Sequence, residues 1–248
     1  MNQIALLVLV IGHVLGDFYF QSSTLAKDKE TSGKKLLLHC FLYLTIMVGV
    51  TIPFFGWSLL KVAIGVSMSH FLIDGVKFFL THHFSIKKSQ DTVVFLIDQS
   101  LHLLVLLVAG VYLTLSSIKL HFIPGIEKLV TSLGWDMGNI LSWILILLVL
   151  VQPCSITIKK VLNFYRPTNE EHVDEGIPNA GALIGVFERL FIVLMLYANQ
   201  FTAIGFVLTA KSIARYNKIS ENPQFAEYYL LGTLLSTLLI IISYFFAF

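Results

Sequence analysis

The chain has 248 residues, of which 56% are hydrophobic and only 13% are charged. Because a soluble domain carries about 25% charged residues, this composition excludes an ordinary soluble protein, and the mean hydropathy of +0.80 indicates an integral membrane protein. The formal net charge of +2 is too small to suggest a nucleic-acid partner. Cys40 and Cys154 both fall in apolar runs, which favours buried thiols over a disulfide.

Apolar runs long enough to cross a bilayer, which takes about 20 residues each, predict eight membrane segments in one domain spanning residues 1–248. The expected segments are 4–21, 35–52, 59–80, 93–116, 139–161, 180–198, 201–216 and 228–246. We therefore expect an all-α polytopic transmembrane helical bundle. Residues 180–216 also allow a single long helix, but Ala198-Asn199-Gln200 favours a tight hairpin between two helices.

The distribution of lysine and arginine predicts the orientation. With both termini outside, the loops on the cytoplasmic side hold most of the cations, namely Lys27, Lys29, Lys34, Lys35, Lys87, Lys88, Lys159, Lys160, Arg166, Lys211, Arg215 and Lys218. The outer side keeps Lys61, Lys119 and Lys128. This asymmetry agrees with the positive-inside rule and favours eight segments over seven. The outer loop 117–138 also contains a short amphipathic pattern at residues 126–130, typical of a surface helix.

Histidine and aspartate recur four residues apart inside three of the predicted segments. The pairs are His13 with Asp17, His70 with Asp74, and Asp98 with His102. Each pair lies on one helical face. Ionisable groups in the hydrocarbon cost about 2.5–3.5 kcal/mol each, so they are normally paired, line a cavity or carry function. All six lie in the half of the membrane that the loop charges assign to the cytoplasm, which favours a single site.

An imidazole and a carboxylate on adjacent turns suit a divalent cation, zinc before iron or manganese. These six residues exceed the ligands of one tetrahedral zinc, so either two metals bind or one carboxylate, for which we favour Asp17, is the general base. His39, Glu188 and Arg189 are further catalytic candidates, with His39 and Arg189 stabilising an oxyanion or phosphate. Glu188 and Arg189 also fit an internal charge pair. The expected headgroup-binding residues are Lys211, Arg215 and Glu227. Helix packing explains the glycines at 12, 16, 181 and 185.

The string Gly12-His13-x-x-Gly16-Asp17-Phe18-x-x-Gln21 resembles the opening of domain-of-unknown-function family 3307, a bacterial membrane-protein family. The resemblance continues through the elements that begin at His70, Asp98 and Ile184, and through residues 210–216 and 226–234. It implies a bacterial inner-membrane location and supplies no activity. The residue types on the helices are also similar to those of membrane-embedded metal-dependent hydrolases, such as the ceramidase-like superfamily with its buried His/Asp zinc site, although no motif is shared.

These patterns lead to an expected function, an intramembrane metal-dependent hydrolase or transferase acting on a lipid or lipid-linked substrate. Two alternatives stay open. The same residues suit a divalent-cation or proton transporter or channel, but no inverted repeat is visible and the residues crowd one side of the membrane. The second alternative is a membrane partner subunit whose polar network is structural. The acidic loop 163–178 would then contact the partner protein. The sequence leaves a homo-oligomer open.

Overall fold

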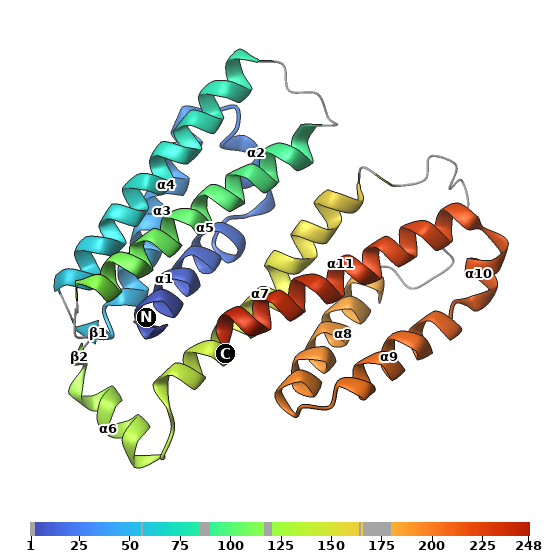
Figure 1. The fold of residues 1–248 in the computed structure, drawn as a ribbon. Helices are drawn as coiled ribbons and strands as arrows, with labels where there is room; N and C mark the ends of the chain where they lie inside the picture. Colours follow the sequence, from blue (N-terminus) through green and yellow to red (C-terminus); the bar gives the residue numbers. More distant parts are fainter. Residues whose placement is uncertain (1–2, 56, 85–89, 117–120, 164, 166–179) are drawn as a thin grey trace. The chain divides into compact units, whose positions relative to one another are not determined.

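The computed structural model describes residues 3–55, 57–84, 90–116, 121–163, 165 and 180–248 (Figure 1). Six of its helices are long and apolar enough to cross a membrane, and two shorter apolar helices accompany them at residues 3–19 and 201–213. Together these eight correspond to the eight predicted segments, and the expected all-α polytopic bundle is confirmed. The helices gather into two compact units, Met1–Leu145 and Ile146–Phe248, which we describe separately.

The first unit is a bundle of helices with a short strand pair at one end (Figure 1). Its helices are α1 (Gln3–Val14), the π-helix η1 (Leu15–Tyr19), α2 (Ser23–Asp28), α3 (Gly33–Thr51), α4 (Trp57–His83), α5 (Asp91–Leu115) and α6 (Pro124–Ser132). The strands β1 (Phe54–Phe55) and β2 (His121–Phe122) pair antiparallel. Helix α1 packs against both α3 and α5, and α4 packs against the same two helices, so α1, α3, α4 and α5 enclose one core.

Helix α7 (Met137–Leu162) runs from the first unit into the second. The second unit continues with α8 (Ala180–Tyr197), α9 (Phe201–Ile213), α10 (Tyr216–Glu221) and α11 (Pro223–Ala247). Helix α8 packs against α9 and α11. The predicted hairpin after α8 is confirmed, because Asn199 takes a left-handed φ of 55° and the amide of Gln200 donates to the carbonyl of Met195. This is a Schellman end, in which asparagine tolerates the left-handed conformation.

The outward faces of the first unit's helices are apolar, as a bilayer requires. On α4, the side chains of Met68, Leu72, Val76 and Phe79 are all more than half exposed. Water would oppose such a continuous exposed apolar face, whereas lipid accepts it. The predicted surface helix appears as α6, and the acidic loop 163–178 lies almost wholly outside the described residues. Cys154 is buried and Cys40 partly exposed, and both are free thiols.

Two glycines allow α1 and η1 to approach α3 closely. A Cβ on Gly12 would lie 2.7 Å from Met47 Sδ, and a Cβ on Gly16 would lie 2.7 Å from the ring of Tyr43. The packing role predicted for these two glycines is confirmed, whereas Gly181 has open space around it. The π-helix η1, which contains Gly16, has a wider turn than an α-helix. This wider turn shifts Asp17 around the helix axis. Close packing and the π-turn together bring Asp17 into the core.

Candidate metal centre

Four side chains from three elements meet in the core of the first unit. They are Asp17 on η1, His39 on α3, and His70 and Asp74 on α4. Each of these side chains is at most 5% exposed. The two Nε2 atoms, from His39 and His70, lie 3.0 Å apart. His39 Nε2 is 3.2 Å from Asp17 Oδ1 and 3.3 Å from Asp74 Oδ2, and His70 Nε2 is 3.6 Å from both oxygens.

These distances match the spacing of ligand atoms around a tetrahedral metal. In a tetrahedron the ligand–ligand edge is about 1.6 times the bond length, so zinc bonds of about 2.0–2.2 Å require edges of about 3.3–3.6 Å. Five of the six edges are known here, and they run from 3.0 to 3.6 Å. Two imidazoles and two carboxylates also form a donor set suited to zinc, iron or manganese. The four residues therefore fit a divalent cation in chemistry and in spacing.

Neighbouring side chains fix the orientation of these groups. The ring of Tyr43 stacks on that of His70 with centroids 3.7 Å apart and planes within 6°. The hydroxyl of Tyr43 lies 3.2 Å from His13 Nδ1. Gln99 donates from Nε2 to Asp17 Oδ2 at 3.1 Å, and the ammonium of Lys29 donates to Asp74 Oδ2 at 2.8 Å. Such outer contacts hold metal-ligating residues in place in known metal sites.

The three aspartates share a pattern in how their two oxygens are used. In Asp17, Asp74 and Asp98, Oδ2 accepts a hydrogen bond from a lysine or from Gln99. In each of them, Oδ1 is buried and accepts no hydrogen bond from the described residues, although Asp17 Oδ1 lies 3.2 Å from His39 Nε2. An unpaired buried carboxylate oxygen is costly, so this pattern points to a cation that faces the Oδ1 atoms.

The remaining predicted ligands lie beside the tetrahedral set. Histidine or carboxylate atoms within 4.8 Å of one another form three groups: His13 with Asp17 and His70, His39 with His70 and Asp74, and Asp74 with Asp98 and His102. His70 and Asp74 each belong to two of these groups. The ring centroids of His70 and His102 are 4.3 Å apart. All six residues predicted as metal ligands are thus gathered in one cluster, together with His39.

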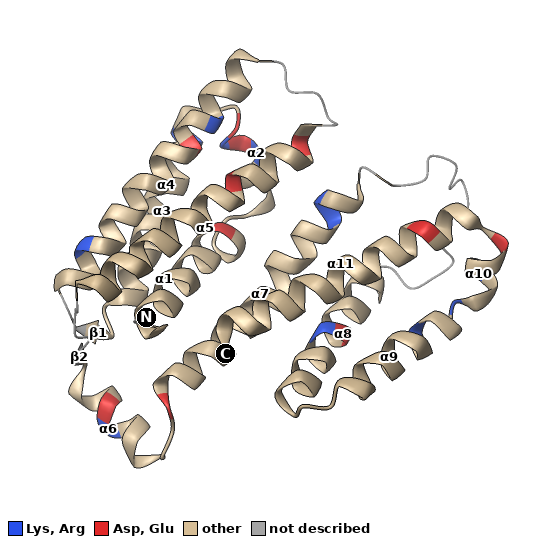
Figure 2. Ribbon diagram, in the orientation of Figure 1, with Lys and Arg blue, Asp and Glu red and all other residues tan. Residues whose placement is uncertain are grey.

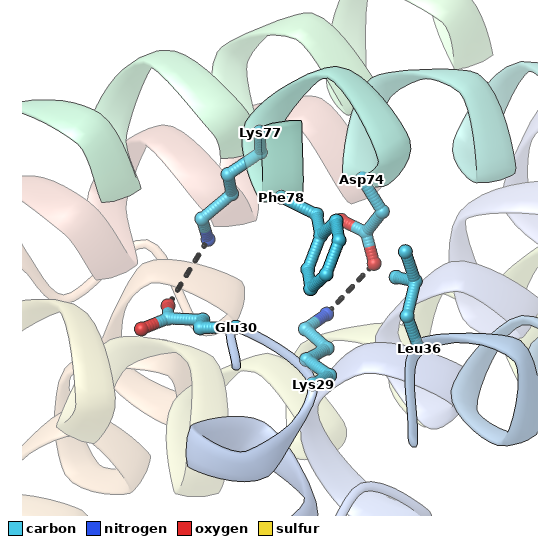
Figure 3. A pocket seen from close by; sticks show the side chains of 6 residues that line it. All are labelled: Lys29, Glu30, Leu36, Asp74, Lys77 and Phe78. Carbon is cyan, nitrogen blue, oxygen red and sulfur yellow. Dashed lines mark hydrogen bonds and ion pairs between the residues drawn. The ribbon is translucent and has the colours of Figure 1, made fainter. Parts of the chain in front are cut away.

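A small pocket of about 10 Å³ adjoins Asp74 at one end of the bundle. Figure 3 shows Lys29 reaching Asp74 and Lys77 reaching Glu30 across this pocket, with Phe78 between them. Burial alone disfavours the charged form of Lys29, but the carboxylates of Asp17 and Asp74 outweigh it and raise its pKa above 10.5. Lys29 therefore carries a full positive charge at neutral pH. Figure 2 shows most charged residues of α2, η1, α4 and α5 near this end of the unit.

The other predicted site residues lie in the second unit. Arg189 is buried and donates to the carbonyl of Leu150, to Ser155 Oγ at 2.8 Å and to Ser236 Oγ at 3.3 Å. Glu188 is paired with Lys211, and Lys211 also donates to Thr233 Oγ1 at 3.3 Å. These three hydrogen bonds explain how the guanidinium of Arg189 can be buried between packed helices without a catalytic role. Arg215 and Glu227, predicted to bind a headgroup with Lys211, are both exposed.

Four residues that contact the cluster were not among the predicted site residues, namely Lys29, Tyr43, Lys77 and Gln99. Lys29 entered the sequence argument only as a loop cation, and no local pattern connects it to Asp74, 45 residues away. Tyr43 could have been found, because it follows His39 by four residues and so shares its helical face. His39 was predicted as an oxyanion stabiliser, and its Nε2 lies within the tetrahedral set.

Comparison with known proteins adds one result. A model of the family "Protein of unknown function (DUF3307)" matches residues 5–131, about half of the chain. The matched segment lies within the first unit and includes every residue of the tetrahedral set, Lys29 and His102. No curated protein and no solved structure matches the chain. The chain belongs to the DUF3307 family of proteins of unknown function.

Proposed function

We propose that this protein is an intramembrane metal-dependent hydrolase or transferase that acts on a lipid or lipid-linked substrate. The observation that supports it best is the near-tetrahedral set of His39, His70, Asp17 and Asp74, whose facing atoms are separated by 3.0–3.6 Å inside an apolar bundle. A divalent metal held there, with zinc first, would polarise an ester or phosphoryl oxygen and activate water.

Asp17 is the residue to which we assign the general base. Its Oδ1 faces the two imidazole nitrogens, while its Oδ2 is held by Gln99. A carboxylate with one fixed oxygen and one inward oxygen would be placed to accept the proton of an attacking water. The amide of Asn cannot accept that proton at neutral pH. Asp17→Asn should therefore lower turnover much more than metal content.

The lysines at the pocket favour an anionic substrate over cation transport. Lys29 and Lys77 lie 2.8 Å from Asp74 and 3.5 Å from Asp98. Ammonium groups held beside a bound metal would attract a phosphate or carboxylate group, and they cannot ligate a travelling cation. A lipid headgroup of that charge would reach the site from the same end of the bundle. The same network still offers a relay for protons, so transport is the second candidate.

The first experiment measures metal in protein purified in detergent through a tag that contains no histidine. We expect at least one equivalent of zinc, iron or manganese in the wild type. His39→Ala and His70→Ala should lose it and still elute as folded protein by size exclusion. His83→Ala, which removes an exposed histidine of α4, is the matched control and should retain the metal. Wild-type protein that takes up none of the three metals after reconstitution would refute the metalloenzyme.

The second experiment separates catalysis from transport. Metal-loaded protein is incubated with bacterial lipid extract in vesicles, and products are identified by mass spectrometry. We expect a lipid or lipid-linked species to be consumed by the wild type and spared by Asp17→Asn. Vesicles that show no lipid turnover but release or take up protons or metal ions only when the protein is present would identify a transporter instead.

A further inference from the structure

Part of the histidine–carboxylate cluster remains unsatisfied after the tetrahedral set has been assigned. Asp74 Oδ1, Asp98 Oδ1 and both ring nitrogens of His102 are buried and have no hydrogen-bond partner among the described residues. The three residues are 2%, 6% and 3% exposed. Leaving several polar atoms unpaired in an apolar core costs about 1–3 kcal/mol each, and more for a carboxylate. A single bound cation would satisfy both carboxylate oxygens and one ring nitrogen of His102.

The geometry of these three residues suits a metal of its own. Each offers one carboxylate oxygen or imidazole nitrogen, and the three atoms lie within 4.8 Å of one another, from the facing helices α4 and α5. Two carboxylates and one imidazole are a donor set for manganese, iron or zinc. Three protein ligands leave coordination positions open for water or substrate, which is the arrangement of catalytic rather than structural metal sites.

Asp74 connects this group to the tetrahedral set. Its Oδ2 is the oxygen that lies 3.3 Å from His39 Nε2, while its Oδ1 is the unpaired oxygen. One carboxylate can therefore serve both groups, with one oxygen toward each cation. Asp98 has a similar arrangement, because Gln99 and Lys77 donate to its Oδ2 while its Oδ1 accepts no hydrogen bond from the described residues.

We propose that a second divalent cation binds Asp74 Oδ1, Asp98 Oδ1 and His102, so that the protein holds a two-metal centre bridged by Asp74. This proposal rests on the proposed function, because it adds a second cation beside the metal site that His39, His70, Asp17 and Asp74 would form. In known enzymes two metals about 3.5–4 Å apart stabilise the attacking and leaving oxygens of a phosphoryl group.

Charge then indicates the class of substrate. Asp17, Asp74, Asp98 and Glu30 carry four negative charges, and Lys29 and Lys77 supply two positive charges, so the cluster without metal is negative by two. A first divalent cation makes the cluster neutral, and a second makes it positive by two. A buried excess of two positive charges requires an anionic ligand. The two-metal centre therefore fits a phosphate ester, whose oxygens can bind both cations and both ammonium groups.

The test counts tight manganese sites. Chelator-treated protein in detergent is titrated with Mn²⁺, and the free ion is followed by its electron paramagnetic resonance signal. We expect two tight sites in the wild type and in the control His83→Ala. Asp98→Asn and His102→Ala should each retain one. At low temperature the loaded wild type should give the spectrum of a coupled manganese pair, and the two variants the spectrum of an isolated ion.

The outcomes separate the two proposals. One tight site in the wild type, unaffected by Asp98→Asn and His102→Ala, overturns the second cation and leaves the proposed metalloenzyme intact. No tight manganese site in the wild type overturns the two-metal centre, and the metalloenzyme is overturned with it only if the protein takes up neither zinc nor iron after reconstitution. The spectrum of the loaded wild type decides the question without the variants, because an uncoupled signal at saturation excludes a bridged pair even where a variant does not fold.

Discussion

Lys29 carries a charge whose role is structural as well as electrostatic. Its side chain is 9% exposed, and its ammonium lies 2.8 Å from Asp74 Oδ2. Replacing Lys29 with Met leaves a buried carboxylate without its cation, which typically costs about 3 kcal/mol. For a chain of this size that corresponds to a fall in Tm on the order of 10 °C. We expect this fall in metal-free protein, measured by thermal unfolding in detergent.

The same ion pair predicts a pH dependence with a definite sign. The pKa of Lys29 is raised above 10.5 in the folded protein, so folding favours the protonated lysine. Its contribution to stability is therefore complete below pH 10.5 and is lost as the pH rises through the folded-state pKa. The Tm difference between wild type and Lys29→Met should stay constant from pH 6 to pH 9 and shrink only at higher pH. A difference that disappears near neutral pH would contradict this assignment.

At the scale of elements, contact between η1 and α3 connects backbone packing to the metal site. A Cβ on Gly16 would lie 2.7 Å from the ring of Tyr43, and that ring stacks on His70. Tyr43 has no flexible end to move aside, so Gly16→Ala should cost about 1–3 kcal/mol and displace the imidazole of His70. We expect a lower Tm together with weaker metal binding, measured by metal titration.

Gly49 supplies the matched control for that substitution. It lies on α3, and a Cβ built there meets nothing within 4 Å. Alanine in a helix is favoured over glycine by about 1 kcal/mol, so Gly49→Ala should leave both Tm and metal affinity unchanged or slightly improved. Equal losses in Gly16→Ala and Gly49→Ala would show that the effect does not come from Tyr43.

Sequence periodicity predicted the parts of the site that lie on a single helix. The pairs on α4 and α5 were visible because an α-helix places residues four apart on one face. The π-turn at Asp17 was not visible, since no local rule predicts the wider turn. His39 joins the cluster through tertiary packing of α3 against α4, and Lys29 joins it from the end of α2, so residue spacing within one helix predicts neither contact. Helix positions could thus be predicted, but not which ligands face each other.

Arg189 illustrates a polar group that supports an irregular helix. Its Nε donates to the carbonyl of Leu150, next to the Val149 carbonyl whose backbone donor is missing at Pro153. Neighbouring side chains commonly satisfy carbonyls in such irregular turns of membrane helices. Arg189→Met should therefore lower the Tm on the order of 10 °C, by loss of about 3 kcal/mol, while the metal content stays at the wild-type value. Loss of turnover with an unchanged Tm would favour the catalytic role predicted from sequence.

At the scale of the whole molecule, the two units carry different kinds of polar group. The first holds the histidine–carboxylate cluster, and the family model matches within it. In the described part of the second, the buried charges are Glu188, paired with Lys211, and Arg189, bonded to helix carbonyl and hydroxyl groups. This division places the proposed chemistry in the first unit. The orientation of that unit in the membrane is then decisive, because it would determine which compartment supplies the proposed substrate.

The loop charges predict that the end of the first unit that carries α2, Lys29 and Lys77 lies on the cytoplasmic side. Ser23, at the start of α2, and Ser132, at the end of α6, are both exposed. In a protein with Cys40 and Cys154 replaced by serine, a cysteine at 132 should react with a membrane-impermeant maleimide in intact spheroplasts. A cysteine at 23 should react only after permeabilisation, and the cysteine-free protein in neither case. The reverse pattern would show that the pocket faces the outside, and it would exclude a substrate drawn from the cytoplasmic leaflet. Both substitutions preserve side-chain size and leave every loop charge in place, so the labelling reports the native orientation.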